Sequence, residues 1–161
     1  MARVLAARLR HDLTSTREEL VKTMSESPSV DLEWSPAGEM KTYRAILKEI
    51  GAMEVESAIF LQTGRVPEWS EAESKVSEGP LPALRESLTE IRRETLSLLD
   101  GADDRWLETP VDIPTEWVKF MGDSNIERQE FFRWIVRHEY YHLGQIVTYR
   151  WIQGVDPYSR A

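Results

Sequence analysis

Apolar residues recur at every third or fourth position along most of the chain, which is the spacing of one face of an α-helix. Four stretches show this pattern clearly, at roughly residues 2–26, 39–61, 82–100 and 124–153. The segments between them are rich in Ser, Pro, Gly and charged residues, and none alternates between apolar and polar residues as a half-buried strand does. The pattern therefore predicts an all-α fold, a four-helix bundle with long connecting loops.

Each of the four stretches carries one apolar stripe that we expect to face a common core. A length of 161 residues suits one domain, so we assign residues 1–161 to a single unit. The stripe residues are Leu5, Leu9, Leu13, Thr16, Leu20 and Met24; Tyr43, Ile46, Leu47, Ile50, Met53 and Phe60; Leu84, Leu88, Ile91, Thr95 and Leu98; and Phe131, Ile135, Ile146 and Tyr149.

Local signals predict where the helices begin and end. Gly64 should close the second helix and Pro82 should open the third, since proline suits a first helical turn. Gly101 is expected to end the third helix in a left-handed cap. The segment 124–127, Ser-Asn-Ile-Glu, matches a capping box, so the fourth helix is expected to begin there and to stop at Gly154.

Composition narrows the chemistry. The chain has no cysteine, so any metal must be held by His, Asp or Glu side chains. A net charge of −8 argues against binding to nucleic acid or to an anionic membrane. No apolar run reaches the ~20 residues that a membrane span needs, and the first residues lack the apolar region of a secretion signal. We therefore expect a cytoplasmic protein.

Two histidines interrupt the apolar stripe of the fourth stretch. His138 and His142 lie one helical turn apart, in an arc of roughly 80° that also holds the stripe residues. Burying imidazole nitrogens without partners is costly, and two imidazoles at this spacing can each direct a nitrogen at one cation. The pair is therefore a candidate metal site; a hydrogen-bonded pair without a metal is the alternative.

A third ligand has to come from another helix. His11, the only other histidine, lies on the polar face of its stretch. Glu49 stands at the edge of the second stripe, where a cation would compensate its charge near apolar side chains. Glu54 and Glu56 are competing candidates, although solvated positions beside the stripe explain both of them.

The histidines belong to the motif H-E-x-x-H, which in zinc proteases supplies two metal ligands and a general base. Gly144 and Thr148 do not fit the protease pattern x-x-G-x-x-H that follows the second histidine, and no strand pattern precedes the motif. Glu139 is then a candidate for orienting a histidine or contacting a bound water, unless it is a solvated surface residue. Gln145, at the edge of the histidine face, is the other candidate for such a supporting role, and it could bond a ligand or only a loop backbone.

Three stretches resemble the DinB-like (DinB/YfiT) superfamily of metal-dependent four-helix bundles. The first, 34–60, is a Trp-x-Pro loop leading into a helix that contains Leu-Lys-Glu-Ile around Glu49; the second is the long loop before the last helix. The third, 138–154, reads H-x-x-x-H-x-G-Q and continues to a glycine. The resemblance implies up-down-down-up topology, frequent homodimers and a triad of three histidines, two of which match His138 and His142. Glu49 stands where the family has its third histidine.

Some members of this superfamily are thiol S-transferases or isomerases that use low-molecular-weight thiols. The resemblance thus implies a metal-dependent enzyme acting on a small molecule, such as a thiol S-transferase. A metal that lowers the pKa of a bound water or thiol would serve the hydrolysis of a small amide or ester as well as thiol transfer. One divalent ion, Zn, Ni, Fe or Mn, would be held by Glu49, His138 and His142. The alternative is a non-catalytic, dimeric binding or stress-response bundle with a vestigial or structural metal site. Aromatic residues that could line a pocket, or only pack the core, are Trp34, Tyr43, Trp117, Tyr141 and Tyr149.

Overall fold

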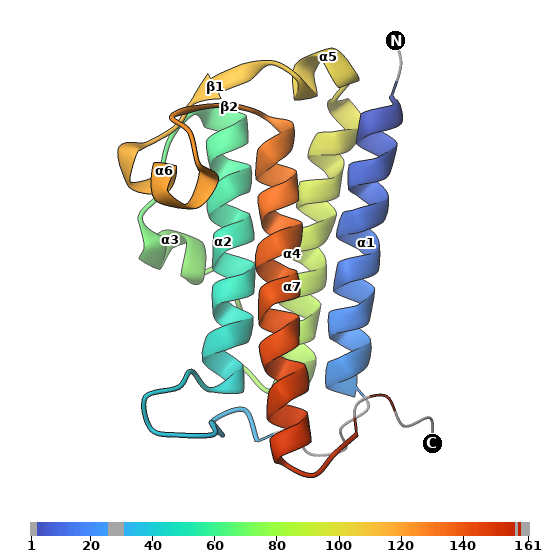
Figure 1. Cartoon of the computed structure of the whole chain (residues 1–161), viewed down its shortest axis with the longest axis vertical. Helices are drawn as coiled ribbons and strands as arrows, with labels where there is room; N and C mark the ends of the chain where they lie inside the picture. The colour runs from blue at the N-terminus through green and yellow to red at the C-terminus, as the bar shows by residue number, and fades with distance from the viewer. Residues whose placement is uncertain (1–2, 26–30, 157, 159–161) are drawn as a thin grey trace.

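The computed structural model describes residues 3–25, 31–156 and 158; the ends of the predicted first helix at 2 and 26, and part of the loop after it, lie outside these residues. Four long helices run side by side (Figure 1): α1 (Val4–Ser25), α2 (Tyr43–Thr63), α4 (Leu81–Gly101) and α7 (Gln129–Ile152). The short elements are α3 (Trp69–Glu73), α5 (Asp104–Leu107), β1 (Pro110–Asp112), α6 (Thr115–Met121) and β2 (Asn125–Glu127). The chain is mainly helical, as its periodicity predicts.

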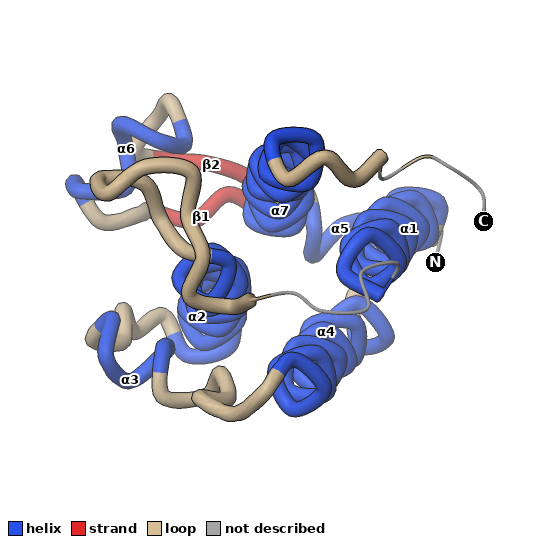
Figure 2. The backbone as a smooth tube through the Cα atoms, turned by 90° about the horizontal axis from the view of Figure 1, so that it is seen from below, coloured by secondary structure: helices blue, strands red, loops and turns tan. Residues whose placement is uncertain are grey.

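The long helices form two parallel pairs. In Figure 1, α1 and α7 run from the top of the molecule to the bottom, and α2 and α4 run from the bottom to the top. Seen end-on in Figure 2, α1 and α2 occupy opposite corners, and each packs against both α4 and α7. Parallel neighbours need a long connection between them, and the segment holding α3 spans the length of the bundle between α2 and α4.

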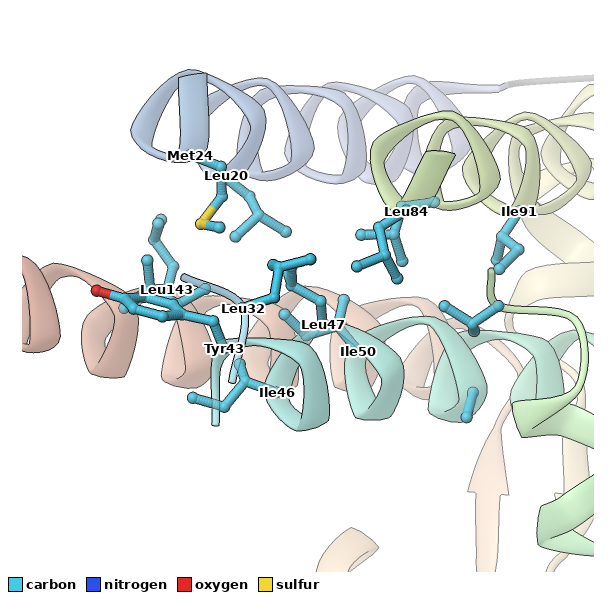
Figure 3. Close-up of a cluster of buried hydrophobic side chains, with 14 of the residues drawn as sticks. Leu20, Met24, Leu32, Tyr43, Ile46, Leu47, Ile50, Leu84, Ile91 and Leu143 are labelled. Atoms are coloured by element: carbon cyan, nitrogen blue, oxygen red, sulfur yellow. The ribbon is translucent and has the colours of Figure 1, made fainter. Parts of the chain in front are cut away.

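The predicted stripes form the core. All stripe residues are buried except Leu5 and Leu98, which are partly exposed; Leu99 is buried beside Leu98. Figure 3 shows the lower part of this core, where Leu47 and Ile50 of α2 lie among side chains from the neighbouring helices. Burial of each such side chain contributes roughly 1.5–3 kcal/mol, which makes this packing the main reason that the helices assemble.

Several helix ends differ from the prediction. α2 begins at Tyr43 rather than near residue 39, because the Thr42 side chain accepts a hydrogen bond from the Ala45 N–H and caps the helix there. Gly64 ends this helix in the left-handed conformation, φ 70°, as predicted. Gly101, by contrast, is the last residue of α4, and the capping residue after it is Ala102 with φ −90°, so the predicted left-handed glycine cap is wrong.

The predicted capping box at 124–127 is also wrong. Asn125–Glu127 forms strand β2, which pairs antiparallel with β1, and α7 begins only at Gln129. The reason is tertiary: Ile126 of β2 is buried against Ile113 and Phe131, and an extended backbone brings it there. The expectation that the chain has no strands therefore fails for this short ribbon. None of the described helices combines the length and apolar character that crossing a membrane requires.

Candidate metal centre

The side chains of α2 and α7 bring three potential metal ligands together. His138 and His142 project from one face of α7, and their Nε2 atoms are 3.2 Å apart. Glu49 faces them from α2, with oxygens 3.9 Å from the Nε2 of His138 and 3.7 Å from that of His142. One donor atom from each residue lies within 4.8 Å of the other two. The convergence follows from the antiparallel packing of α2 against α7.

This donor set fits a divalent cation. Two nitrogen ligands about 2.0–2.1 Å from one ion lie roughly 3.0–3.4 Å apart, depending on the geometry, and the two imidazoles already have this separation. The Glu49 carboxylate would have to approach by roughly half an ångström to complete the set. Two imidazoles and one carboxylate suit Zn, Fe, Mn and Ni, and three protein ligands leave further positions open.

His142 is held in the form that a metal needs. Its ring is buried, which lowers the pKa of His142 because desolvation disfavours the charged imidazolium. In the neutral ring, Nδ1–H donates to Oε1 of Gln145 at 2.7 Å, and Gln145 in turn donates to the Tyr141 hydroxyl at 3.1 Å. The lone pair of Nε2 therefore points into the site. Gln145 is not itself one of the three potential ligands; it fixes the orientation of one of them, His142, by this hydrogen bond.

His138 lacks such support. Its Nδ1 is buried and has no hydrogen-bond partner among the described residues, while its ring packs 5.9 Å from that of Trp134. Without a cation, the Nε2–H of His138 is the group that can donate to the Nε2 of His142. A cation at the site would displace this proton to Nδ1, so the two histidines are not equivalent.

Glu49 already has a cationic partner. The Lys41 ammonium, from the turn before α2, contacts Oε2 of Glu49. The nearby His138 ring and the Lys41 ammonium lower the pKa of Glu49 to about 2, although burial opposes the shift. Glu49 is therefore ionised at neutral pH. Sequence reasoning did not identify Lys41, because it lies outside every helical stripe.

The three ligands stand in the wall of a cavity of about 800 Å³ between α2, α7 and the segment that holds α6. Tyr141, Tyr149 and Trp117 line it, as anticipated. Trp34 and Tyr43 instead stack on each other at a ring distance of 5.9 Å, within the core. The cavity wall also contains five residues that the sequence did not mark as lining it: Met53, Phe120, Met121, Phe131 and Trp134.

Glu54 and Glu139 do not belong to this centre. Both are almost fully buried, at 0% and 1% exposure, so the solvated position expected for Glu54 and the solvated alternative for Glu139 are both wrong. Their carboxylates bind two buried arginines: Arg17 lies 2.7 Å from Glu54 and 2.6 Å from Glu139, and Arg92 contacts both acids. Glu139 thus supports the bundle interior, and its carboxylate oxygens are engaged by arginines rather than by a histidine.

The two arginines were missed although their spacing could have revealed them. Arg17 follows Leu13 by four residues and precedes Leu20 by three, and Arg92 follows Leu88 by four and precedes Thr95 by three. Both positions lie on the apolar stripe, where a charge requires a partner of opposite sign. His11, in contrast, is exposed, as its position on the polar face predicted.

Comparison with known proteins adds one match. A family model described as the DinB superfamily matches residues 12–146, a range that includes Glu49, His138 and His142. No curated protein matches the sequence.

Proposed function

The chain belongs to the DinB superfamily, and from that premise we propose that it is a divalent-metal-dependent enzyme that acts on a small molecule. One observation carries the proposal: Glu49, His138 and His142 each place a donor atom within 4.8 Å of the other two, in the wall of a large, mainly apolar cavity. A structural ion has no need of such a cavity, whereas a catalytic ion needs open positions that a substrate can reach.

The residues of the site would have three different roles: holding the metal, orienting a ligand and binding the substrate. Glu49, His138 and His142 would hold one ion of Zn, Ni, Fe or Mn, and Gln145 would orient His142 from behind. A divalent ion at this position lowers the pKa of a water or thiol bound to it toward neutrality. The aromatic walls exclude water and bind the apolar part of a substrate. Transfer of a low-molecular-weight thiol and hydrolysis of a small amide or ester both agree with this arrangement.

A second candidate function is a non-catalytic binding or stress-response bundle with a vestigial site. The contact between Lys41 and Glu49 favours it, because the ammonium already neutralises the carboxylate that a metal would use.

The directions of α1, α2, α4 and α7 support the up-down-down-up topology of the proposed fold. A homodimer and a cytoplasmic location stay predictions from the sequence.

Metal binding separates the two functions. The protein is purified without chelator, its metal content is measured, and the stripped protein is titrated calorimetrically with Zn, Ni, Mn and Fe(II). We expect one ion per chain, and we expect His138→Ala to weaken binding at least about tenfold because it removes one of three ligands. His11→Ala is the matched control, since His11 is exposed on α1, and it should bind metal as the wild type does.

Metal binding alone does not show activity. The metal-loaded protein is therefore assayed for conjugation of small thiols to an electrophile and for hydrolysis of small esters and amides. Wild-type protein that binds none of the four metals, or binds them equally well after His138→Ala, would rule out the metal-dependent enzyme and leave the vestigial bundle.

A further inference from the structure

The cavity continues past the metal centre to a half-buried carboxylate, Glu56. Glu56 follows Glu49 by seven residues, close to two helical turns, so both side chains leave the same face of α2 and line the same cavity. At a rise of 1.5 Å per residue they are roughly 10 Å apart along the helix. This separation is far beyond hydrogen-bond reach, so Glu56 cannot transfer a proton at the metal centre.

Glu56 carries a charge that nothing nearby balances. It is half-buried, and no described residue forms an ion pair or hydrogen bond with it. Of the other charged groups that line the cavity, Lys41 contacts Glu49, Arg137 on the rim lies 3.7 Å from Glu130, and Glu39 is exposed to solvent. Burial and the neighbouring Glu116 both raise the pKa of Glu56, so its surroundings disfavour the bare carboxylate, and a cation bound beside it would offset both effects.

Aromatic rings surround this end of the cavity. Glu116, which acts on Glu56, precedes Trp117 in α6, and the Trp117 ring packs 5.1 Å from Phe60, one turn after Glu56. Phe131 packs 5.2 Å from Phe60 and 6.2 Å from Trp117, and it also lines the cavity. A carboxylate beside aromatic faces is the arrangement that binds organic ammonium groups, through a charge-assisted hydrogen bond and cation–π attraction.

We propose that Glu56 and the Trp117 wall form a subsite for the ammonium group of the substrate. The substrate class is then an amine in which an apolar spacer of roughly 10 Å separates the nitrogen from the group that reacts at the metal. The assignment of the reacting end rests on the proposed function. The ammonium subsite itself needs no metal, because Glu56 and Trp117 stand apart from the three ligands.

The subsite is tested on metal-free protein with three ligands of equal length: octylammonium, octanol and octanoate. Binding is followed by calorimetry and by tryptophan fluorescence at neutral pH. We expect octylammonium to bind the wild type most tightly of the three. Glu56→Gln should weaken the binding of octylammonium about tenfold and change the affinity for octanol less than about twofold. Glu108→Gln removes the same charge from an exposed position outside the cavity and should leave all three affinities unchanged.

Two results would overturn the subsite. One is that octanoate binds as tightly as octylammonium; the other is that Glu56→Gln and Glu108→Gln weaken octylammonium equally, which would indicate only the overall charge of the protein.

A fourth ligand links the subsite to the metal centre. Aminooctanethiol should bind metal-loaded wild-type protein at least about tenfold more tightly than either octanethiol or octylammonium, because both of its ends are held. His138→Ala should remove the contribution of the thiol and keep that of the amine. If wild-type protein binds aminooctanethiol no more tightly than octylammonium, the thiol contributes nothing, and the metal function alone is contradicted. If it binds aminooctanethiol no more tightly than octanethiol, the amine contributes nothing, and the subsite alone is contradicted.

Discussion

Lys41 occupies the place at Glu49 that a metal ion would contest. Its side chain is about half exposed, and it contacts the same carboxylate oxygen that lies 3.7 Å from His142. A cation that binds between Glu49 and the histidines must displace this ammonium and tolerate its charge. The affinity of the site for metal is therefore set partly by a residue that is not a ligand.

Lys41→Met should strengthen metal binding. The substitution frees Glu49 and removes a like charge beside the ion, and for a half-exposed pair screened by solvent we expect the Kd for Zn to fall about three- to tenfold. Calorimetric titration of the stripped protein measures the change. Lys75→Met, at an exposed position outside the cavity, serves as the control. An unchanged Kd in Lys41→Met would show that the contact between Lys41 and Glu49 does not weaken the binding of metal.

Single residues also show how far sequence reasoning reaches at this site. His138 and His142 stand out because an apolar stripe at helical spacing passes through both of them. Glu49 is the predicted third ligand because it borders the stripe of a second helix. Glu54 and Glu139 border stripes in the same way, yet they face the arginines in the core. A position at the edge of a stripe does not say which neighbouring helix the side chain meets.

At the scale of elements, one glycine sets how closely α2 approaches α4 and the segment after α3. A Cβ built on Gly51 would lie 2.6 Å from a Val76 methyl and 2.9 Å from a Leu88 methyl, closer than real contacts allow. Gly144, in α7, has open space around the same position. Both glycines lie inside long helices, so the same substitution in each separates helix propensity from packing.

Gly51→Ala should destabilise the protein by about 1–3 kcal/mol, because the overpacking of Val76 and Leu88 outweighs the gain in helix propensity. Gly144→Ala should stabilise it by up to about 1 kcal/mol, since propensity is then the only change. Urea unfolding followed by circular dichroism gives both values. Equal changes in the free energy of unfolding would mean that Val76 and Leu88 move aside to accommodate the added methyl group, so that packing around Gly51 does not require a glycine.

At the scale of the whole molecule, four buried charges join the four long helices. Arg17 comes from α1, Glu54 from α2, Arg92 from α4 and Glu139 from α7. Burial alone would raise the pKa of Glu54, but the positive charges of Arg92 and Arg17 outweigh it and hold that pKa below its ordinary value. Two positive and two negative groups balance one another, so each helix is fixed relative to the other three.

Glu54→Gln should destabilise the fold by about 3–5 kcal/mol, because it leaves buried guanidinium charge without a full counter-charge. Glu90→Gln, at an exposed ion pair with Arg93, should cost less than about 1 kcal/mol. Urea unfolding at neutral pH compares the two variants with the wild type. If both variants lose less than about 1 kcal/mol of unfolding free energy, Glu54 is not needed to balance the charges of the buried arginines.

The same carboxylate predicts a pH dependence. Because the pKa of Glu54 is lower in the folded protein than in the unfolded chain, its contribution is complete above the unfolded value and is lost as pH falls through the folded one. Between pH 7 and pH 3 the free energy of unfolding should therefore fall more steeply for the wild type than for Glu54→Gln. A parallel decline in the two proteins would assign the acid sensitivity to other groups.

The sequence by itself determined the four long helices, nearly all of their buried faces, the single pair of inward histidines and the acidic residue opposite them. These features repeat with the period of one helix, and the cost of exposing apolar surface or burying an unpaired nitrogen acts on each helix alone.

Only the tertiary structure decided which side chains meet between elements. It turned the apparent capping box at 124–127 into a strand, because burial of Ile126 prevailed over a local capping signal. It also paired Glu54 and Glu139 with arginines, placed Lys41 on Glu49, and brought α6 over the cavity. Such contacts join residues far apart in the sequence, so they depend on helix register and loop path, which no single stretch of the chain encodes.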